Sequence, residues 1–205
     1  MTTLVLLRHG ETPLTPHKRL SGSGGSDPGL SPAGRRQAEA AAEALAHRGG
    51  IEAVVTSPMR RCQETAQAVA KRLGLHVRVE QDLREADFGA WEGLTFAEVR
   101  ARHPDDLDAW LASPESPPTG AAETMRQVTH RVAAVRDGLL ARHAGATVLV
   151  VSHVVPVRTL LRLALQAPPH SLFRMDVAAA SLSTVTYDES GTATVRSLND
   201  THHLS

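Results

Sequence analysis

Two histidines and several arginines directly follow runs of apolar residues in this sequence. His9 comes after Arg8 at the end of LVLLRHG, and His153 follows the apolar run ATVLVVS. Arg60 and Arg61 stand a few residues after a third apolar run, IEAVVTS. Imidazole and guanidinium groups gathered at one place repel one another unless an anion lies among them, because like charges within about 4 to 6 Å disfavour the charged forms. The pattern therefore predicts a site for a phosphate-sized dianion.

Phosphate chemistry would suit this group of residues. A guanidinium presents a planar fork of N–H donors that matches pairs of phosphate oxygens, and helix N-termini contribute further backbone donors. The same positive charges favour the neutral form of imidazole, which is the form that can attack phosphorus. We therefore interpret His9 as a nucleophile that lies in a pocket for a phosphoryl group.

The apolar runs can bring these residues together only if they form neighbouring strands. TLVLL at 3–7 is apolar almost throughout, which is typical of a strand buried on both faces of a parallel sheet. Further strands are predicted for 51–57, 76–79 and 146–152. Ligands of open α/β sheets bind beyond the carboxyl ends of the strands. The residues that follow the strands are therefore expected to meet at one edge of the sheet.

Helices are expected to alternate with these strands. Ser31 and Pro32 supply an N-cap and a first-turn proline for the helix AGRRQAEAAAEALAHR. Ser57 and Pro58 predict a similar start for a second helix, which Gly74 ends. This alternation is the pattern of βαβ units, in which helices on the faces of a sheet join parallel strands.

The second half of the chain adds more helices and a hairpin. Helices are predicted over 95–112 and 121–143, separated by an exposed proline-rich connector at 113–120. Another helix is expected from about Pro156 to Gln166 after the last parallel strand. The segments LSTVTYD and TATVRSL then predict a C-terminal hairpin with a glycine in its turn.

These elements predict an α/β architecture in a single domain that covers residues 1–205. We expect three α/β/α layers around a mostly parallel central sheet, with a small helical cap insertion at about 90–125 and the C-terminal hairpin. A chain of 205 residues that is 41% hydrophobic is long enough to bury one full core.

Composition limits the partners that this chain is expected to bind. Lysine plus arginine and aspartate plus glutamate number 22 each, so no overall field favours nucleic acid or an anionic membrane. The chain shows no signal peptide and no apolar stretch near the ~20 residues that span a bilayer. A single cysteine, Cys62, fits a reducing compartment, and we expect a cytoplasmic protein. No HExxH, CxxC or paired ligand spacing predicts a metal, and no feature fixes an oligomeric state.

Four segments in order resemble the histidine phosphatase superfamily, which is also called the phosphoglycerate mutase-like superfamily. They are LRHGET at 7–12, TSPMRRCQETA at 56–66, LREADFGAWEG at 83–93 and VVSHVVPVR at 150–158, so the resemblance covers nearly the whole chain. VVPVR stands after His153 where mutases commonly have glycine. In this respect the chain is most similar to α-ribazole phosphatase-like proteins and to acid phosphatase domains fused to ribonuclease H.

The resemblance implies a role for five residues of these motifs. His9 would be the phosphorylated nucleophile, and Arg8 and Arg61 would bind the phosphoryl oxygens. His153 would be a second phosphate-binding histidine. Glu85 matches the proton donor, which protonates the leaving oxygen and later takes a proton from the attacking water.

The resemblance also assigns residues around this centre. Thr15 stands where asparagine is common, and Arg19 matches an arginine that often borders the pocket, so both are expected to bind substrate. The supporting residues would be Glu11, Arg60, Asp87 and Glu92. Asp87 and Glu92 remain alternatives to Glu85, because a general acid needs reach and a tuned pKa rather than a fixed spacing.

The function that the resemblance implies is that of a phosphomonoesterase of the acid phosphatase type. It would hydrolyse a small-molecule phosphate ester through a phosphohistidine on His9, without a metal or other cofactor. Hydrolysis is favoured over transfer because cofactor-dependent mutases generally have a longer cap and C-terminal tail. One alternative is a phosphoglycerate mutase-type isomerase, and another is a catalytically silent module that binds a phosphorylated ligand, since fold does not fix function.

Three other features are interpreted as structural. Trp91 and Trp110 are expected to pack in the core or the cap rather than to bind substrate. The terminal segment NDTHHLS is interpreted as a structural tail rather than a metal site. Ser57 is expected to cap a helix rather than to act as a nucleophile, because no GxSxG motif surrounds it.

Overall fold

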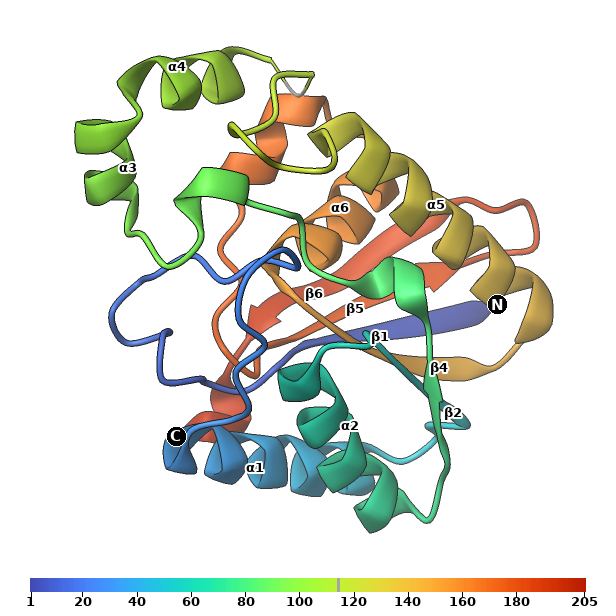
Figure 1. The fold of residues 1–205 in the computed structure, drawn as a ribbon. Helices are drawn as coiled ribbons and strands as arrows, with labels where there is room; N and C mark the ends of the chain where they lie inside the picture. Colours follow the sequence, from blue (N-terminus) through green and yellow to red (C-terminus); the bar gives the residue numbers. More distant parts are fainter. Residues whose placement is uncertain (114) are drawn as a thin grey trace.

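A six-stranded sheet forms the centre of the computed structural model, which describes residues 1–113 and 115–205 (Figure 1). The strands lie in the order β3-β2-β4-β1-β5-β6. The first four in sequence pair in parallel, and the last two pair antiparallel. Their bounds are β1 Thr2–Arg8, β2 Ala53–Thr56, β3 Val77–Val79, β4 Thr147–Ser152, β5 Leu182–Tyr187 and β6 Ala193–Asp200. The predicted α/β fold with a mostly parallel sheet and a C-terminal hairpin is confirmed.

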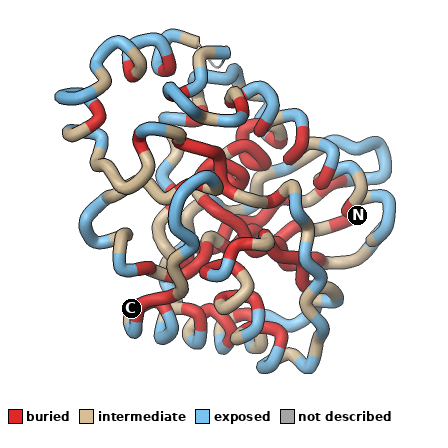
Figure 2. The backbone as a smooth tube through the Cα atoms, viewed as in Figure 1, coloured by how far each residue is buried: buried red, intermediate tan, exposed pale blue. Residues whose placement is uncertain are grey.

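Helices cover both faces of this sheet, and alternate strand residues pack against each layer (Figures 1 and 2). Leu4 and Leu6 of β1 belong to a core with α5 (Met125–Arg142) and α6 (Val154–Ala164). Val5 and Leu7 point the other way, into a core with α1 and α2. These two helices span Pro32–Arg48 and Arg60–Leu73. The continuous apolar run in β1 is therefore explained by burial on both faces.

The predicted helix over 95–112 is in fact two helices. α3 (Phe96–Arg102) and α4 (Pro104–Ala112) are separated at His103, whose φ and ψ are −134° and 54°. Proline lacks an N–H donor and disfavours helical geometry in the residue before it, so Pro104 breaks the helix and starts the next one. Both helices stand apart from the sheet, at the upper left of Figure 1.

Two other helix starts differ from the predicted positions. α5 begins at Met125 rather than 121, because Thr124 forms a capping box with Gln127. α6 begins at Val154, two residues before Pro156, since the first turn of a helix needs no intrahelical N–H donors and accommodates proline. The predicted connector 113–120 precedes α5. Of its residues, Pro114 lies outside the part of the chain that the structure describes.

Ser57 does not cap α2, contrary to the prediction. α2 begins at Arg60, and its N-cap residue Met59 makes no side-chain cap. Ser57 lies too far before the helix to act as the cap residue, and its Oγ instead lies 2.7 Å from His153 Nε2. The carboxylate of Asp27, from the loop SGSGGSDPG at 21–29, accepts the free N–H of Arg60 at 3.0 Å. A residue from a distant loop therefore performs the capping that the local sequence was expected to supply.

The last residues of the chain form a short 3-10 turn, η4 (His202–Leu204), that packs against α1. Leu204 contacts the core between α1, α2 and the sheet. His203 Nε2 lies 3.0 Å from the carbonyl oxygen of Ala180. These contacts agree with the interpretation of the tail as structural. Within the described ranges, no group of three or more His, Cys, Asp and Glu side chains is placed to hold a metal ion.

Candidate active site

The register of the sheet brings the predicted residues to one edge. Arg8 at the end of β1 pairs with Ser152 at the end of β4, and Thr56 at the end of β2 pairs with Val151. His9 N–H donates to Ser152 O at 3.0 Å, and Ser57 N–H donates to Val151 O at 3.0 Å. The next residue along each strand is thus a functional candidate, as the rule for α/β sheets predicts.

A cavity of about 350 Å³ opens at this edge. Five residues predicted for the site line it at its polar end or along its rim: Arg8, His9, Thr15, Arg19 and Arg61. Glu85 also lines the cavity. His153 lies directly behind His9, with 5.2 Å between the ring centroids and an edge-on orientation. Six of the seven predicted residues therefore line one space, and the seventh, His153, is buried behind it.

His9 is held as a neutral imidazole whose Nε2 carries no proton. Its Nδ1 lies 2.7 Å from the carbonyl oxygen of Gly10, an acceptor that requires the proton on Nδ1. Nε2 then carries the lone pair and accepts from Arg61 Nε at 3.3 Å. Burial lowers the pKa of His9 well below its usual range, and the charges of Arg8 and Arg61 lower it further. Nε2 is thus the ring nitrogen whose lone pair could act as a nucleophile.

Gly10 allows this arrangement because only glycine fits beside α1. A Cβ atom at Gly10 would lie 2.5 Å from the carbonyl oxygen of Gly34, which is far closer than van der Waals contact. The N–H of Gly10 also donates to Thr65 Oγ1 at 3.1 Å, in α2. The close approach of the strand end to two helices therefore fixes the carbonyl oxygen that orients the ring of His9.

Arg61 reaches the site, whereas its neighbour Arg60 does not. Arg61 is 1% exposed and donates from Nη2 to Ser21 O at 2.8 Å and from Nη1 to Asp27 at 3.5 Å. Arg60 points outward and donates to Glu64 at 2.7 Å on the surface of α2. Asp27, which also caps α2, was not predicted as a site residue. Its DPG sequence context indicates only a turn, so no sequence signal marks this contact.

His153 is completely buried behind His9. Its Nε2 contacts Ser57 Oγ at 2.7 Å and lies 3.3 Å from the Sγ atom of Cys62. Burial lowers the pKa of His153 well below its usual range, and the charge of Arg61 adds to this effect. Burial also raises the pKa of the Cys62 thiol, so a neutral thiol lies against the neutral ring of His153.

Arg8 keeps donor capacity for a ligand. Its Nη1 donates to Val177 O at 2.7 Å, while Nε is buried and has no hydrogen-bond partner among the described residues. Burial lowers the pKa of Arg8, an effect that Glu85 opposes. A buried, incompletely bonded guanidinium costs free energy unless an anion completes its contacts. This is the electrostatic condition that the sequence predicted for a phosphate site.

Glu85 differs from the two alternative carboxyl groups. It is 4% exposed and accepts from Ala86 N–H at 2.8 Å and from Val155 N–H, at the start of α6, at 3.3 Å. Burial raises the pKa of Glu85 above its usual range. Asp87 instead accepts from Gly89 N–H and Ala122 N–H, and Glu92 accepts from Gly22 N–H. Of these three carboxyl groups only Glu85 lines the cavity, which suits a general acid.

The supporting residue Glu11 and the predicted substrate-binding residues Thr15 and Arg19 make hydrogen bonds that hold loops. Glu11 accepts from Ser31 Oγ at 2.8 Å and so steadies the cap of α1. Arg19 donates to Gly93 O at 2.6 Å and to Glu98 at 2.9 Å, which ties its loop to α3. Thr15 Oγ1 accepts from the N–H of Thr12 at 3.0 Å. Thr15 and Arg19 retain their place in the cavity wall.

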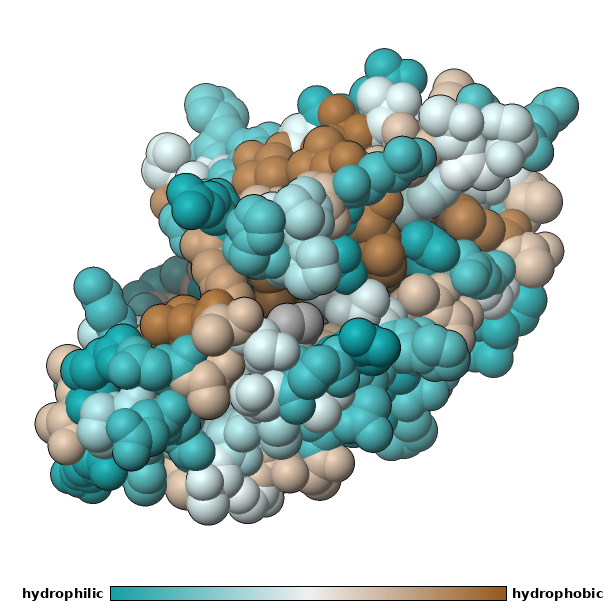
Figure 3. All heavy atoms as spheres, turned by 90° about the horizontal axis from the view of Figure 1, so that it is seen from above, coloured by the Kyte–Doolittle hydropathy of each residue, from teal (hydrophilic) through white to brown (hydrophobic). Residues whose placement is uncertain are grey.

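The end of the cavity opposite His9 is apolar. Its wall contains all three phenylalanines and one of the two tryptophans of the sequence, together with leucines: Phe88, Phe96, Trp110, Phe173, Leu20 and Leu172. Trp110 lies between Phe96 and Phe173, with centroid distances of 6.2 and 4.5 Å. Figure 3 shows apolar side chains gathered around a hollow in this face. No spacing in the sequence predicts this wall, since it joins α3, α4 and the turn η3 (Pro169–Arg174).

The two tryptophans therefore differ in their roles. Trp91 is fully buried and packs edge-on against Trp110 at 5.5 Å, as the packing interpretation predicted. Trp110 takes part in the same packing but also presents a surface to the cavity. Among the described residues, no helix is long and apolar enough to cross a lipid bilayer.

Comparison with known proteins shows which family this chain resembles in sequence. A family model described as "Histidine phosphatase superfamily (branch 1)" matches residues 4–201. The chain is 48% identical over 203 residues to a bifunctional protein of Mycobacterium tuberculosis, covering 99% of this chain and 55% of that protein. It is also 31% identical over 204 residues to phosphoserine phosphatase 1 of Hydrogenobacter thermophilus, covering 100% of this chain and 95% of that protein.

The fold is likewise similar to solved structures. The structure of mycobacterial glucosyl-3-phosphoglycerate phosphatase with VO3 matches with a TM-score of 0.86 and 31% identity, covering 97% of this chain and 99% of that one. Because this match covers nearly the whole chain, the likeness extends through both the sheet and the segments that form the cavity wall. The chain spans about half (55%) of the length of the first curated relatives that it matches.

Proposed function

The chain belongs to the histidine phosphatase superfamily, and on that premise we propose that it is a phosphomonoesterase. It hydrolyses a small-molecule phosphate ester through a phosphohistidine on His9. The observation that carries this proposal is the state of His9, a neutral imidazole whose Nε2 faces the guanidinium of Arg61 at 3.3 Å. A neutral nucleophile within a cationic pocket is the arrangement that phosphoryl transfer to nitrogen requires.

The first step transfers the phosphoryl group to the enzyme. Arg8, Arg61 and His153 bind the phosphoryl oxygens, and the lone pair of His9 Nε2 attacks phosphorus. The bond between phosphorus and the ester oxygen breaks as Glu85, in its protonated form, donates a proton to the departing alcohol. The raised pKa of Glu85 keeps that proton available closer to neutral pH than an exposed glutamate would.

The second step returns the enzyme to its starting state. Glu85, now a carboxylate, takes a proton from a water molecule as the water oxygen attacks the phosphohistidine. The bond between nitrogen and phosphorus breaks, and its electron pair returns to His9 Nε2. Inorganic phosphate then leaves the site. Positive charge for both steps comes from protein side chains, so the proposed reaction needs no metal.

The apolar end of the cavity indicates the kind of alcohol that leaves. We propose that the substrate carries an apolar or aromatic group against Phe96, Trp110 and Phe173, because this wall offers few polar partners. Two of the relatives described above are a phosphoserine phosphatase and a glucosyl-3-phosphoglycerate phosphatase, and both named substrates are phosphate esters of small molecules. Equal numbers of acidic and basic residues, 22 each, support a small molecule rather than nucleic acid as the partner.

We also propose a single domain over 1–205 in which residues 90–125 form a cap. α3 and α4 lie within this segment and carry Phe96 and Trp110 to the wall opposite His9. The cap would then select substrates, while the strand ends perform the reaction. A cytoplasmic location is proposed on the basis of Cys62, a buried free thiol.

Phosphate release tests the proposed function. The protein should release phosphate from p-nitrophenyl phosphate and from an alkyl phosphate, and EDTA should leave both rates unchanged. Aromatic phosphates should give a higher kcat/KM than 3-phosphoglycerate or phosphoserine. Isomerisation of phosphoglycerate without net hydrolysis would identify a mutase instead, and phosphate binding without either reaction would identify a silent binding module. Loss of activity in EDTA that a divalent ion restores would contradict the metal-free mechanism.

A further inference from the structure

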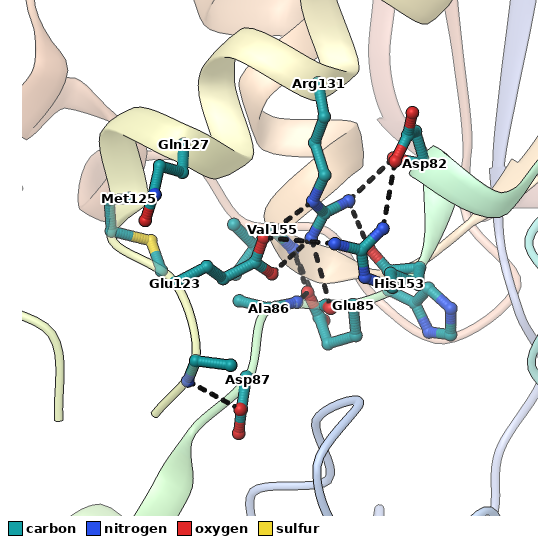
Figure 4. Close-up of polar contacts among 12 residues, drawn as sticks. Asp82, Glu85, Ala86, Asp87, Glu123, Met125, Gln127, Arg131, His153 and Val155 are labelled. Carbon is teal, nitrogen blue, oxygen red and sulfur yellow. Dashed lines mark hydrogen bonds and ion pairs between the residues drawn. The ribbon is translucent and has the colours of Figure 1, made fainter. Parts of the chain in front are cut away.

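Arg131 contacts the backbone that carries Glu85, although it does not line the cavity. It lies in α5 and is 8% exposed. Its guanidinium donates to the carbonyl oxygens of Asp82, Arg84 and Glu85 at 2.6, 2.8 and 3.2 Å. Figure 4 shows the guanidinium between this segment and the carboxylate of Glu123. A single side chain thus binds three carbonyl groups within four residues of the chain.

The segment around Glu85 lies between two short turns and outside regular secondary structure. The short turn η1 (Gln81–Leu83) ends before it, and the next turn, η2 (Gly89–Trp91), begins after it. Residues 84–88 belong to no strand or helix, so no backbone ladder fixes them. Buried carbonyl groups that lack donors destabilise the folded state. The fork of Arg131 supplies donors to three carbonyl groups in and beside this segment.

Glu123 fixes the direction of that fork. Its Oε2 accepts from Arg131 Nε at 2.9 Å, and its Oε1 accepts from Nη2 at 2.7 Å. Glu123 is itself 9% exposed and immediately precedes Thr124, the cap of α5. A buried guanidinium needs a paired carboxylate, and a two-point contact allows only one orientation. With these contacts the five N–H groups of Arg131 have five acceptors in the protein.

We propose that Arg131, held by Glu123, is a positioning residue for the carboxyl group of Glu85. The inference rests on the proposed role of Glu85 as general acid and base. If residues 82–86 shifted, the contact of Glu85 with Val155 N–H at 3.3 Å would break. The phosphate-binding residues belong to other elements, namely β1, α2 and the end of β4, which contacts the segment through the hydrogen bond from Ser152 Oγ to Leu83 O at 2.8 Å. Arg131 thus governs proton transfer separately from phosphate binding.

The substitution Arg131→Met tests this separation. It should lower kcat for an alkyl phosphate by about 10- to 100-fold, since a displacement of about 1 Å costs rates of that order. KM should change little, and the initial burst of nitrophenolate from p-nitrophenyl phosphate should keep its rate, because this leaving group departs without a proton. Arg131→Lys keeps the charge but not the planar fork of donors. Its kcat for the alkyl phosphate should therefore lie between those of wild type and Arg131→Met.

Arg162→Met is the matched control. Arg162 is also 8% exposed and also donates to a carbonyl oxygen, that of Ala167, but among the described residues its hydrogen bonds do not reach residues 82–88. A general loss of folding would lower both ester reactions equally in either variant. Equal losses in the first step of the two esters in Arg131→Met, or the same ratio of first-step losses as in Arg162→Met, would overturn the proposal. If Arg131→Met does not fold, Glu123→Gln decides, since it keeps the shape of Glu123 but loosens the fork and should give the same selective loss.

Glu85→Gln separates failure of this inference from failure of the proposed function. If the wild-type protein hydrolyses neither ester, or if Glu85→Gln slows the first step of both esters equally, the role of Glu85 is wrong and the positioning role falls with it. If Glu85→Gln shows the loss that is selective for alkyl esters while Arg131→Met and Glu123→Gln do not, only the positioning role is wrong. A loss that is selective for alkyl esters in Glu85→Gln, Arg131→Met and Glu123→Gln supports both the role of Glu85 and the positioning role of Arg131.

Discussion

The two ends of the cavity are built in opposite ways. At the phosphate end, His9, Arg61 and His153 are 6%, 1% and 0% exposed, and each is fixed by the end of a strand or the first turn of a helix. At the other end, Phe96 and Phe173 are 48% and 39% exposed and come from short helices away from the sheet. Directional hydrogen bonds fix the first region, whereas the second rests on contact between apolar side chains.

This difference separates the reaction from the choice of substrate. Phosphoryl transfer depends on donors placed to within a fraction of an ångström, which buried and hydrogen-bonded groups provide. Apolar contact has no direction, so an exposed aromatic wall accepts molecules of similar shape. We therefore expect changes at the phosphate end to affect every ester alike. Changes at the aromatic end should alter the preference among esters.

The largest effect is expected for His9→Ala. This substitution removes the nucleophile, and turnover of every ester should fall on the order of 10⁴-fold or more, because only binding and electrostatic effects remain. His17→Ala is the control, since His17 is exposed in the neighbouring loop. Steady-state rates with an alkyl and an aryl phosphate provide the measurement, and a thermal midpoint near that of wild type would show that folding is intact. Substantial turnover by folded His9→Ala protein would assign the nucleophile elsewhere.

The second effect concerns the phosphate clamp. Arg61→Lys keeps a positive charge but loses the planar fork, and kcat should fall roughly 10²- to 10³-fold for all esters, as for the loss of an oxyanion donor. Arg60→Lys should retain nearly full activity, because Arg60 pairs with Glu64 at the surface. The two neighbouring arginines thus form a matched pair of variants. A normal rate for Arg61→Lys together with a low rate for Arg60→Lys would reverse their assignment.

The same contrast explains how much the sequence could predict. Residues such as Arg8, His9 and His153 directly follow apolar strands, so a local pattern and a general rule about sheet edges were enough to place them together. Glu85 and Arg61 were assigned by resemblance to family motifs, and the structure places both at the cavity. The α/β fold could be predicted for the same reason, since strand and helix signals are local.

Contacts between distant segments could not be predicted in this way. Asp27 caps α2 from a loop that is 33 residues away in sequence, and Ser57 binds His153 instead of the helix. Arg131 was predicted only as part of a helix, because its carbonyl partners are 46 to 49 residues away. The aromatic wall was also missed. Such contacts depend on the packing of whole elements, which no local pattern records.

A third prediction concerns the aromatic end. Phe173→Ala should lower kcat/KM for a naphthyl phosphate by roughly 10-fold, because part of an apolar contact is lost. The rate for a small alkyl phosphate should hardly change, and Phe173→Leu should restore most of the loss. Leu165→Ala is the control, since Leu165 is 52% exposed and lies outside the cavity wall. An equal decrease for both substrates in Phe173→Ala would mean that this wall does not select the leaving group.

The smallest expected effect is on stability. The free energy of unfolding should depend on pH differently in a variant at the phosphate end and in one at the aromatic end. Burial raises the pKa of Glu85 in the folded protein. Between the pKa of an unfolded glutamate, about 4.3, and the raised folded value, the folded chain holds a proton that the unfolded chain has lost. The free energy of unfolding therefore falls as the pH rises through this window. Glu85→Gln removes the titrating group, so the free energy of unfolding of this variant should not fall in this way as the pH rises.

Thermal unfolding of Glu85→Gln and Phe173→Ala at several pH values measures this effect. Relative to wild type, the thermal midpoint of Glu85→Gln should rise as the pH is increased from about 4 to about 8, because wild type alone bears the cost of ionising a buried carboxyl group. The amide that replaces this carboxyl group keeps an oxygen acceptor for Ala86 N–H and Val155 N–H. Phe173→Ala changes no titrating group, so its offset from wild type should be constant. A constant offset for Glu85→Gln as well would mean that Glu85 ionises as easily in the folded chain as in the unfolded chain. The tuned proton donor would then have to be sought among Asp87 and Glu92.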